Sequence, residues 1–163
     1  MGPPVWKLAL HRIDPKTTTR NIREFMGNDH RRCDELFAGM ENAANAGDIT
    51  LAHTYFAAFQ VGMEYHFNME EKGFFPTFER ITGMRQGPTT VMRMEHEQMR
   101  GILKQMAQTF ESKDLKALTR TLSTMLMVMQ QHNIKEEQML YPMGDMHIGG
   151  EADDMLHKMQ SMY

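Results

Sequence analysis

Two segments of this 163-residue chain repeat one pattern at a constant separation of 66 residues. The shift superposes the segments without a gap and matches both polar and apolar residues. It places Asp29-His30 on Glu95-His96, and His66, Glu70, Glu71 and Pro76 on His132, Glu136, Glu137 and Pro142. Apolar neighbours match as well, with Phe37 on Leu103, Met63 on Met129 and Phe74-Phe75 on Leu140-Tyr141. Chance rarely preserves so many uncommon residues at one spacing, so the pattern indicates an internal duplication.

The stretches between proline and glycine residues have helical rather than alternating apolar periodicity. This predicts four long helices, over about 17–47, 49–72, 88–110 and 114–140, with Gly73 and Pro76 breaking or kinking the second and the fourth ending before Pro142. Short connections favour an all-α, up-down-up-down four-helix bundle, whose duplicated hairpins are related by a pseudo-twofold axis. We expect an N-terminal arm over 1–16, one bundle domain over 17–145, and a tail over 146–163 with room for a short helix.

Charge and cysteine content exclude several classes of protein. The chain has 18 Lys and Arg against 21 Asp and Glu, a net charge of -3, which gives no basic surface for nucleic acid or an anionic membrane. The single cysteine, Cys33, excludes internal disulfides and cysteine-based metal clusters. No apolar run approaches the roughly 20 residues that span a bilayer, and the first residues do not resemble a targeting signal. We therefore expect a cytoplasmic protein; its oligomeric state is not predicted.

Equivalent residues of duplicated hairpins meet near the pseudo-twofold axis. In each half the first helix supplies a histidine, and the second supplies a histidine with a glutamate four residues later on the same face. Six polar side chains therefore come together: His30, His66, Glu70, His96, His132 and Glu136. Burying them without partners is costly, and two divalent ions bridged by carboxylates remove that cost. Iron is the first choice; manganese and zinc accept similar ligands.

This pattern of a His, a His-x-x-x-Glu, a His and a second His-x-x-x-Glu resembles the hemerythrin-like family of HHE cation-binding proteins. The segments that match are Asn28-Asp29-His30, His66-Phe67-Asn68-Met69-Glu70, Glu95-His96 and His132-Asn133-Ile134-Lys135-Glu136. The resemblance implies a non-haem di-iron centre with an oxo or hydroxo bridge, four terminal histidine ligands, and Glu70 and Glu136 as bridging carboxylates. Glu137 competes with Glu136 for that role.

The resemblance implies a protein that binds or senses dioxygen, or a related small molecule such as nitric oxide or peroxide, rather than an enzyme. The oxygen-carrying relatives have a fifth histidine one turn after the third-helix ligand, where this chain has Arg100. This departure favours redox chemistry or sensing over reversible oxygen carriage. Two alternatives follow: a di-iron redox enzyme with an electron donor, which reduces peroxide or nitric oxide or oxidises iron, and a metal-dependent regulatory or iron-storage module.

The remaining chemically interesting residues have simpler interpretations. His53 lies 13 residues before His66 and points to another helix face, so we expect no ligand role. Glu71 and Glu137 are expected to support ligands or lie in solvent at helix ends, and Asp34 either orients His30 or pairs with a surface arginine. Three histidines lie outside the repeat: His11, His147 and His157.

Sulfur-containing residues are expected to be structural. The chain has 19 methionines, several of them in a Met-rich C-terminal tail, and flexible thioethers are well suited to filling irregular gaps in a bundle. Oxidant buffering and copper binding are weaker alternatives. Cys33 is expected to be a buried apolar residue rather than a nucleophile.

Overall fold

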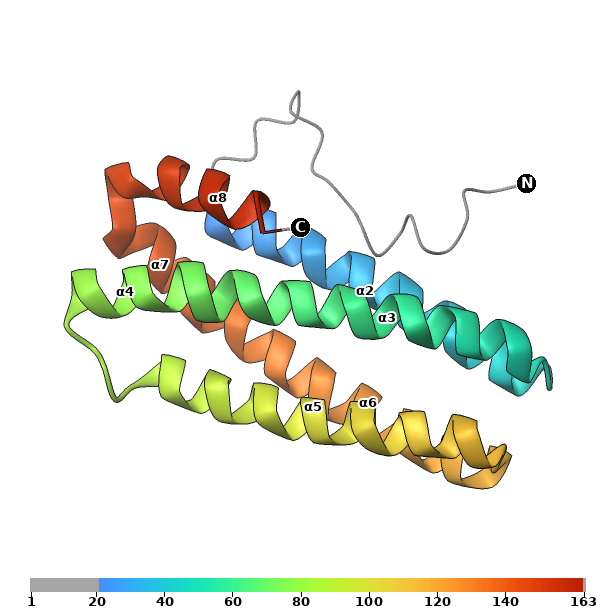
Figure 1. The fold of residues 1–163 in the computed structure, drawn as a ribbon. Helices are drawn as coiled ribbons and strands as arrows, with labels where there is room; N and C mark the ends of the chain where they lie inside the picture. The colour runs from blue at the N-terminus through green and yellow to red at the C-terminus, as the bar shows by residue number, and fades with distance from the viewer. Residues whose placement is uncertain (1–20, 163) are drawn as a thin grey trace.

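The computed structural model describes residues 21–162, which form helices joined by short connections and contain no strand. The main helices are α2 (Ile22–Asn45), α3 (Ile49–Met69), α4 (Phe75–Thr82), α5 (Pro88–Ser112), α6 (Leu115–Lys135), α7 (Tyr141–Ile148) and α8 (Ala152–Gln160). Two π-helical turns, η1 (Glu70–Phe74) and η2 (Glu136–Leu140), join α3 to α4 and α6 to α7, and a 3₁₀ turn (Gly149–Glu151) precedes α8. The predicted all-α four-helix bundle is confirmed (Figure 1).

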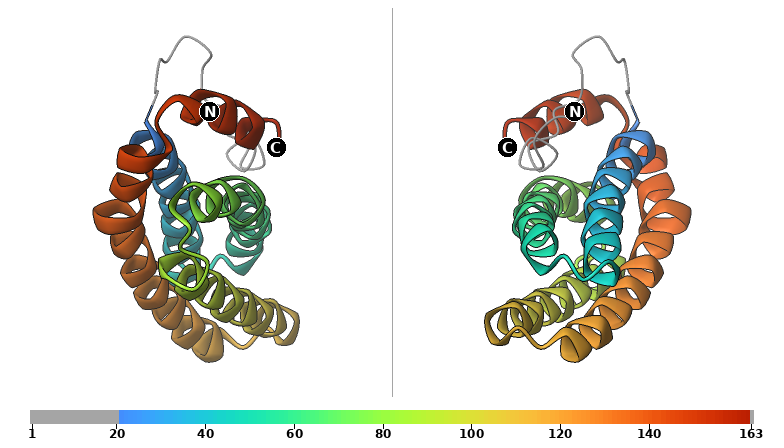
Figure 2. Two further views of the ribbon diagram at one scale, coloured as in Figure 1. Left: turned by 90° about the vertical axis from the view of Figure 1, so that its left-hand side faces the viewer. Right: turned by 90° about the vertical axis from the view of Figure 1, so that its right-hand side faces the viewer.

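The long helices form two hairpins, α2 with α3 and α5 with α6, which run side by side around one core (Figures 1 and 2). Each hairpin has the same parts: a helix, a second helix, a π turn and a short helix that continues it. The C-terminal helix α8 has no counterpart in the first half, and it packs on η1 and α2. The tail predicted to have room for a short helix thus contains one.

Polar side chains start the helices where the sequence predicts starts. Asn21, Asp48 and Asp114 each accept a hydrogen bond from the backbone N–H three residues on, at 2.7, 3.0 and 3.0 Å. Gly83 ends α4 with a φ of 73°, a conformation that favours glycine, and Pro88 opens α5. The start predicted at residues 17–19 lies outside the described residues, where the first helix begins at Ile22.

The prediction that the fourth helix ends before Pro142 is wrong. Helical backbone continues through η2 and α7 to Ile148, and Pro142 lies in the first turn of α7. The backbone N–H of Tyr141 bonds to the carbonyl of Glu136, the five-residue spacing of a π turn, and Phe75 bonds to Glu70 in the same way. This wider turn accommodates the proline that follows, so Pro76 does not end its helix either. Each π turn begins at a predicted metal-ligating glutamate.

Apolar side chains form two buried clusters, one on each side of the six predicted ligands along the bundle axis. One contains Phe37, Phe59 and Met106, and the other contains Phe74, Phe78 and Met159. The predicted core stripes are confirmed, since Ile22, Met26, Cys33, Phe37 and Met40 of α2 and Phe56, Phe59, Met63 and Phe67 of α3 are all buried.

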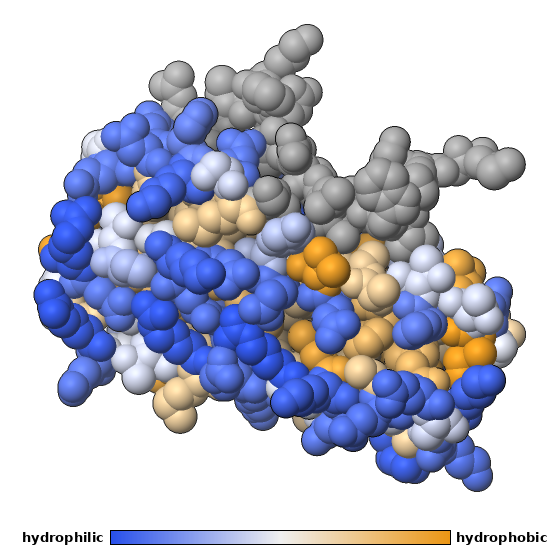
Figure 3. Space-filling view, in the orientation of Figure 1, coloured by the Kyte–Doolittle hydropathy of each residue, from blue (hydrophilic) through white to orange (hydrophobic). Residues whose placement is uncertain are grey.

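Core filling is also confirmed for most of the described methionines, although some are exposed. The buried ones are Met26, Met40, Met63, Met69, Met92, Met99, Met106, Met125, Met129, Met155 and Met159. Met94, Met127, Met139 and Met146 are exposed. The outer face shown in Figure 3 is mainly hydrophilic, with hydrophobic residues gathered toward the end where α2 joins α3. Within residues 21–162, no helix is long and apolar enough to cross a membrane.

Candidate metal centre

The structure brings all six predicted ligand side chains together in the middle of the bundle. They come from six elements: His30 from α2, His66 from α3, Glu70 from η1, His96 from α5, His132 from α6 and Glu136 from η2. All six are buried, and both glutamates are fully so. The internal duplication therefore places equivalent residues at the same depth.

Each central carboxylate lies between imidazoles of both hairpins. Glu70 Oε1 is 3.0 Å from Nε2 of His66 and 3.2 Å from Nε2 of His96. Glu136 Oε1 is 3.1 Å from Nε2 of His132 and 3.0 Å from Nε2 of His30. This is the placement expected of two carboxylates that bridge a pair of ions. Glu136 reaches the centre, whereas Glu137 lies outside it and is a third exposed.

The outward-facing nitrogen of every central imidazole meets a carboxylate. Within a hairpin, Nδ1 of His66 lies 2.7 Å from Asp29, and Nδ1 of His132 lies 2.8 Å from Glu95. Between hairpins, the pairs are His96 with Glu71 at 2.6 Å and His30 with Glu137 at 3.2 Å. A carboxylate accepts a hydrogen bond from Nδ1–H, which sets the tautomer and directs the lone pair of Nε2 into the centre.

The centre therefore consists largely of hydrogen-bond acceptors that face one another. Nε2 of His30 and Nε2 of His66 are 3.1 Å apart. Among residues 21–162, four buried side-chain atoms lack a hydrogen-bond partner, and all belong to this centre: Glu70 Oε1, His96 Nε2, His132 Nε2 and Glu136 Oε2. Unpaired buried acceptors are costly, and a cation satisfies them at once. The residues present thus fit a metal.

The donor atoms divide into two overlapping groups, each compact enough to hold one ion. One group contains Glu70, His96, His132 and Glu136, and the other contains His30, His66 and Glu136. Nitrogen and carboxylate oxygen donors of this kind suit iron, manganese and zinc. The arrangement can therefore hold two neighbouring ions with Glu136 between them.

The central charges shift the pKa values in the directions expected of a cation site. Burial lowers the pKa of His132, but the charge of Glu136 outweighs it and raises the value to about 9. The same opposition, with Glu70 as the main charge, holds the pKa of His66 well above its usual value. Burial alone would raise the pKa of Glu136, but the neighbouring His132 holds it well below its usual range. The centre thus favours positive charge.

Arg100, at the position of the fifth histidine of the oxygen carriers, points away from the centre. Its guanidinium bonds to Glu64 and Glu71 at 3.0 Å and also pairs with Glu97. It lies 5.0 Å from the ring of Phe67. Arg100 therefore supports the carboxylate that holds His96 and supplies no ligand itself.

The sequence analysis missed Tyr141 and gave Asp29 and Glu95 no role. The hydroxyl of Tyr141 lies 2.8 Å from Glu70 and 2.9 Å from Glu136. A signal was present, because the shift of 66 pairs this tyrosine with Phe75, the one place in the matched ligand region where an apolar ring gains a hydroxyl. The matched Asp29-His30 and Glu95-His96 dipeptides were a second signal.

The other candidate residues lie outside the centre. His53 is exposed, with its ring 5.2 Å from that of Phe110, and His147 and His157 are also exposed. Asp34 is exposed as well, and Glu137 rather than Asp34 contacts His30. His11 lies outside the described residues.

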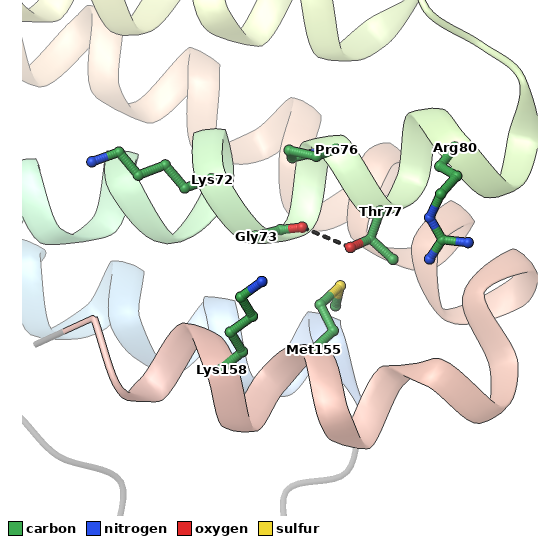
Figure 4. A pocket seen from close by; sticks show the side chains of 7 residues that line it. All are labelled: Lys72, Gly73, Pro76, Thr77, Arg80, Met155 and Lys158. Atoms are coloured by element: carbon green, nitrogen blue, oxygen red, sulfur yellow. Dashed lines mark hydrogen bonds between the residues drawn. The ribbon is translucent and has the colours of Figure 1, made fainter.

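Two further features of the structure also lie apart from the six central side chains. Cys33 is buried, and burial raises the pKa of its thiol to about 11, which agrees with an unreactive apolar role. A surface pocket lies between α8 and the region where η1 continues into α4 (Figure 4), and its lining includes Lys72, Arg80 and Lys158. None of the six central side chains lines it.

Comparison with known proteins agrees with this geometry. A family model described as the hemerythrin HHE cation-binding domain matches residues 21–144, which include all six central side chains. No curated protein and no solved structure matches the chain.

Proposed function

Because the chain belongs to the hemerythrin HHE cation-binding domain family, we propose that it holds two iron ions at this centre and binds or senses dioxygen or a related small molecule, such as nitric oxide or peroxide. The observation that supports the metal most directly is the set of four buried acceptor atoms without hydrogen-bond partners. An apolar bundle with six such side chains at its middle is stable only if something positively charged binds between them.

In this proposal the two overlapping donor groups are the two iron positions. His96 and His132 bind one ion, His30 and His66 bind the other, and Glu70 and Glu136 lie between them. Bound iron would supply a redox-active ion with which dioxygen, nitric oxide or peroxide reacts. Manganese or zinc would fit the same donors without explaining such reactivity equally well.

The chain's own residues orient the ligands and exclude water. The four carboxylates on the Nδ1 atoms hold each ring at a defined angle. The ring of Phe67 stacks 4.3 Å from that of His96, and Phe75 lies 5.6 Å from it on a second side. With apolar clusters on both sides, water reaches the centre poorly and small uncharged molecules are favoured as ligands.

A redox enzyme is the second candidate, and the orientation of Arg100 supports it. Since Arg100 bonds to Glu64, Glu71 and Glu97 instead of entering the centre, each ion receives two imidazoles. This symmetric set differs from that of the reversible oxygen carriers. Repeated turnover of peroxide or nitric oxide with an added electron donor would distinguish the enzyme from a binding or sensing protein.

The first experiment measures metal content together with the optical spectrum. Protein loaded with ferrous iron under anaerobic conditions should contain two irons per chain. Admission of air should then produce a new charge-transfer band. A band that disappears when oxygen is removed supports oxygen binding, and irreversible oxidation supports the redox or sensing role. Failure to bind any iron would overturn the proposal.

A further inference from the structure

Tyr141 places a hydroxyl group inside the candidate metal centre. Its Oη atom lies 2.8 Å from Glu70 Oε2, 2.9 Å from Glu136 Oε1 and 3.2 Å from Nε2 of His30. The side chain is fully buried. Its ring lies 5.6 Å from that of His30 and 5.7 Å from that of Phe74, and these contacts fix its position.

A phenol cannot satisfy these three neighbours by hydrogen bonding. It has one proton to donate, and each of the three atoms is an acceptor when Nδ1 of His30 donates to Glu137. At least one lone pair of the hydroxyl oxygen therefore faces another lone pair at close range. A cation between these atoms turns each repulsive contact into a favourable one.

The two donor groups are unequal, and Tyr141 lies beside the smaller one. The group with His96 and His132 contains both central glutamates, whereas the group with His30 and His66 contains only Glu136. Oη of Tyr141 is within 3.2 Å of two of the three donors of that smaller group. Its partner in the internal duplication is Phe75, which has no donor atom, so the pseudo-twofold symmetry is broken at this point.

We propose that Tyr141 is a metal ligand that binds, through its phenolate oxygen, the ion held by His30, His66 and Glu136. This inference rests on the proposed two-metal function. On binding, the phenol O–H bond breaks, an oxygen–metal bond forms and the proton passes to the buffer, without transfer of an electron. A phenolate is a hard, negatively charged donor known to bind iron in proteins, and it makes this position the one with the greater preference for ferric over ferrous iron.

The test compares three proteins loaded with ferric iron, which is supplied as its nitrilotriacetate complex. They are the wild type, Tyr141→Phe, and the control Tyr55→Phe, whose ring lies against Gly39 on α2. The wild type should show a visible phenolate-to-iron charge-transfer band, with phenolate ring vibrations in the resonance Raman spectrum. Tyr141→Phe should lose both signals and bind one of its two irons at least roughly tenfold more weakly, and Tyr55→Phe should retain them.

A second variant covers the case in which Tyr141→Phe does not fold. The chain has four tyrosines, so the triple change Tyr55→Phe, Tyr65→Phe and Tyr163→Phe leaves Tyr141 as its only phenol. The band should persist in this protein. Two irons per chain without a phenolate band, or a band lost in the triple variant, would overturn the role of Tyr141 and leave the proposed function intact. Absence of bound iron in the wild type would overturn the proposed function itself.

Discussion

Nδ1 of His96 lies 2.6 Å from a carboxylate oxygen of Glu71, so a carboxylate of the first hairpin holds an imidazole of the second. The duplication supplies the reciprocal contact, in which Glu137 of the second hairpin lies 3.2 Å from Nδ1 of His30 in the first. These two contacts join the hairpins across the bundle. They also orient the rings in the metal-free protein, so that little reorganisation is needed when an ion binds.

Replacing one histidine of each proposed metal position should lower metal content. His66→Ala and His132→Ala should each reduce bound iron from two per chain toward one, because each change removes a terminal ligand from a different group. His53→Ala is the control, since His53 is exposed and outside the centre. Metal analysis after gel filtration measures the ratio. Equal loss in all three variants would contradict the assigned ligands.

Neutralising a carboxylate that holds an imidazole should weaken metal binding without removing a ligand. Glu71→Gln and Glu95→Gln should each lower the affinity about 10–100-fold, the usual cost of losing such a partner. Asp34→Asn should leave the affinity unchanged, because Asp34 is exposed and Glu137 takes the place beside His30. Competition with a coloured chelator gives the three constants. An effect confined to Asp34→Asn would reverse the assignment.

Removing the metal should lower the thermal stability. The four acceptor atoms without partners lose their cation, while an ion present at 100 times its dissociation constant stabilises a protein by about 2.7 kcal/mol. Melting curves recorded with and without a chelator should therefore differ by several degrees. The double variant His66→Ala, His132→Ala serves as the control and should respond much less. An unchanged melting temperature in the wild type would argue against a bound ion.

The Cys33 thiol should react slowly in the folded protein. Burial raises its pKa from 9.0 to about 11, so the thiolate fraction at pH 8 is about 100-fold lower than in the unfolded chain. Reaction with an aromatic disulfide should therefore be slow until denaturant is added. Because the folded pKa is the higher one, the stability linked to this group is lost as the pH rises from about 9 to 11. Cys33→Ala should remove that part of the alkaline instability.

Two glycines of the bundle should respond oppositely to alanine. A Cβ at Gly144 would lie 2.7 Å from Cε1 of Phe74, so Gly144→Ala should destabilise the protein by about 1–3 kcal/mol through overpacking. Gly101 lies on exposed α5 with open space around it, and Gly101→Ala should stabilise by up to about 1 kcal/mol. Urea unfolding measures both. A stable Gly144→Ala protein would show that α7 packs less closely on η1 than described.

The sequence by itself determined the fold class and the six central side chains. Helical periodicity and duplicated spacing are local properties, so His66 and Glu70 share a helix face whatever surrounds them. The shift of 66 residues then related the two hairpins, which was enough to predict that His30 and His96 meet the same centre. Helix starts at Asp48 and Asp114 followed from capping chemistry in the same way.

Only the tertiary structure decided how the centre is completed. The π turns kept the helix running past Pro142, and this continuation carries Tyr141 into the centre, whereas a helix ending before the proline would not specify its position. Which carboxylate meets which imidazole, and the outward direction of Arg100, depend on the depth and rotation of facing helices. Those quantities come from packing between residues far apart in the chain, and spacing along a single helix contains no information about them.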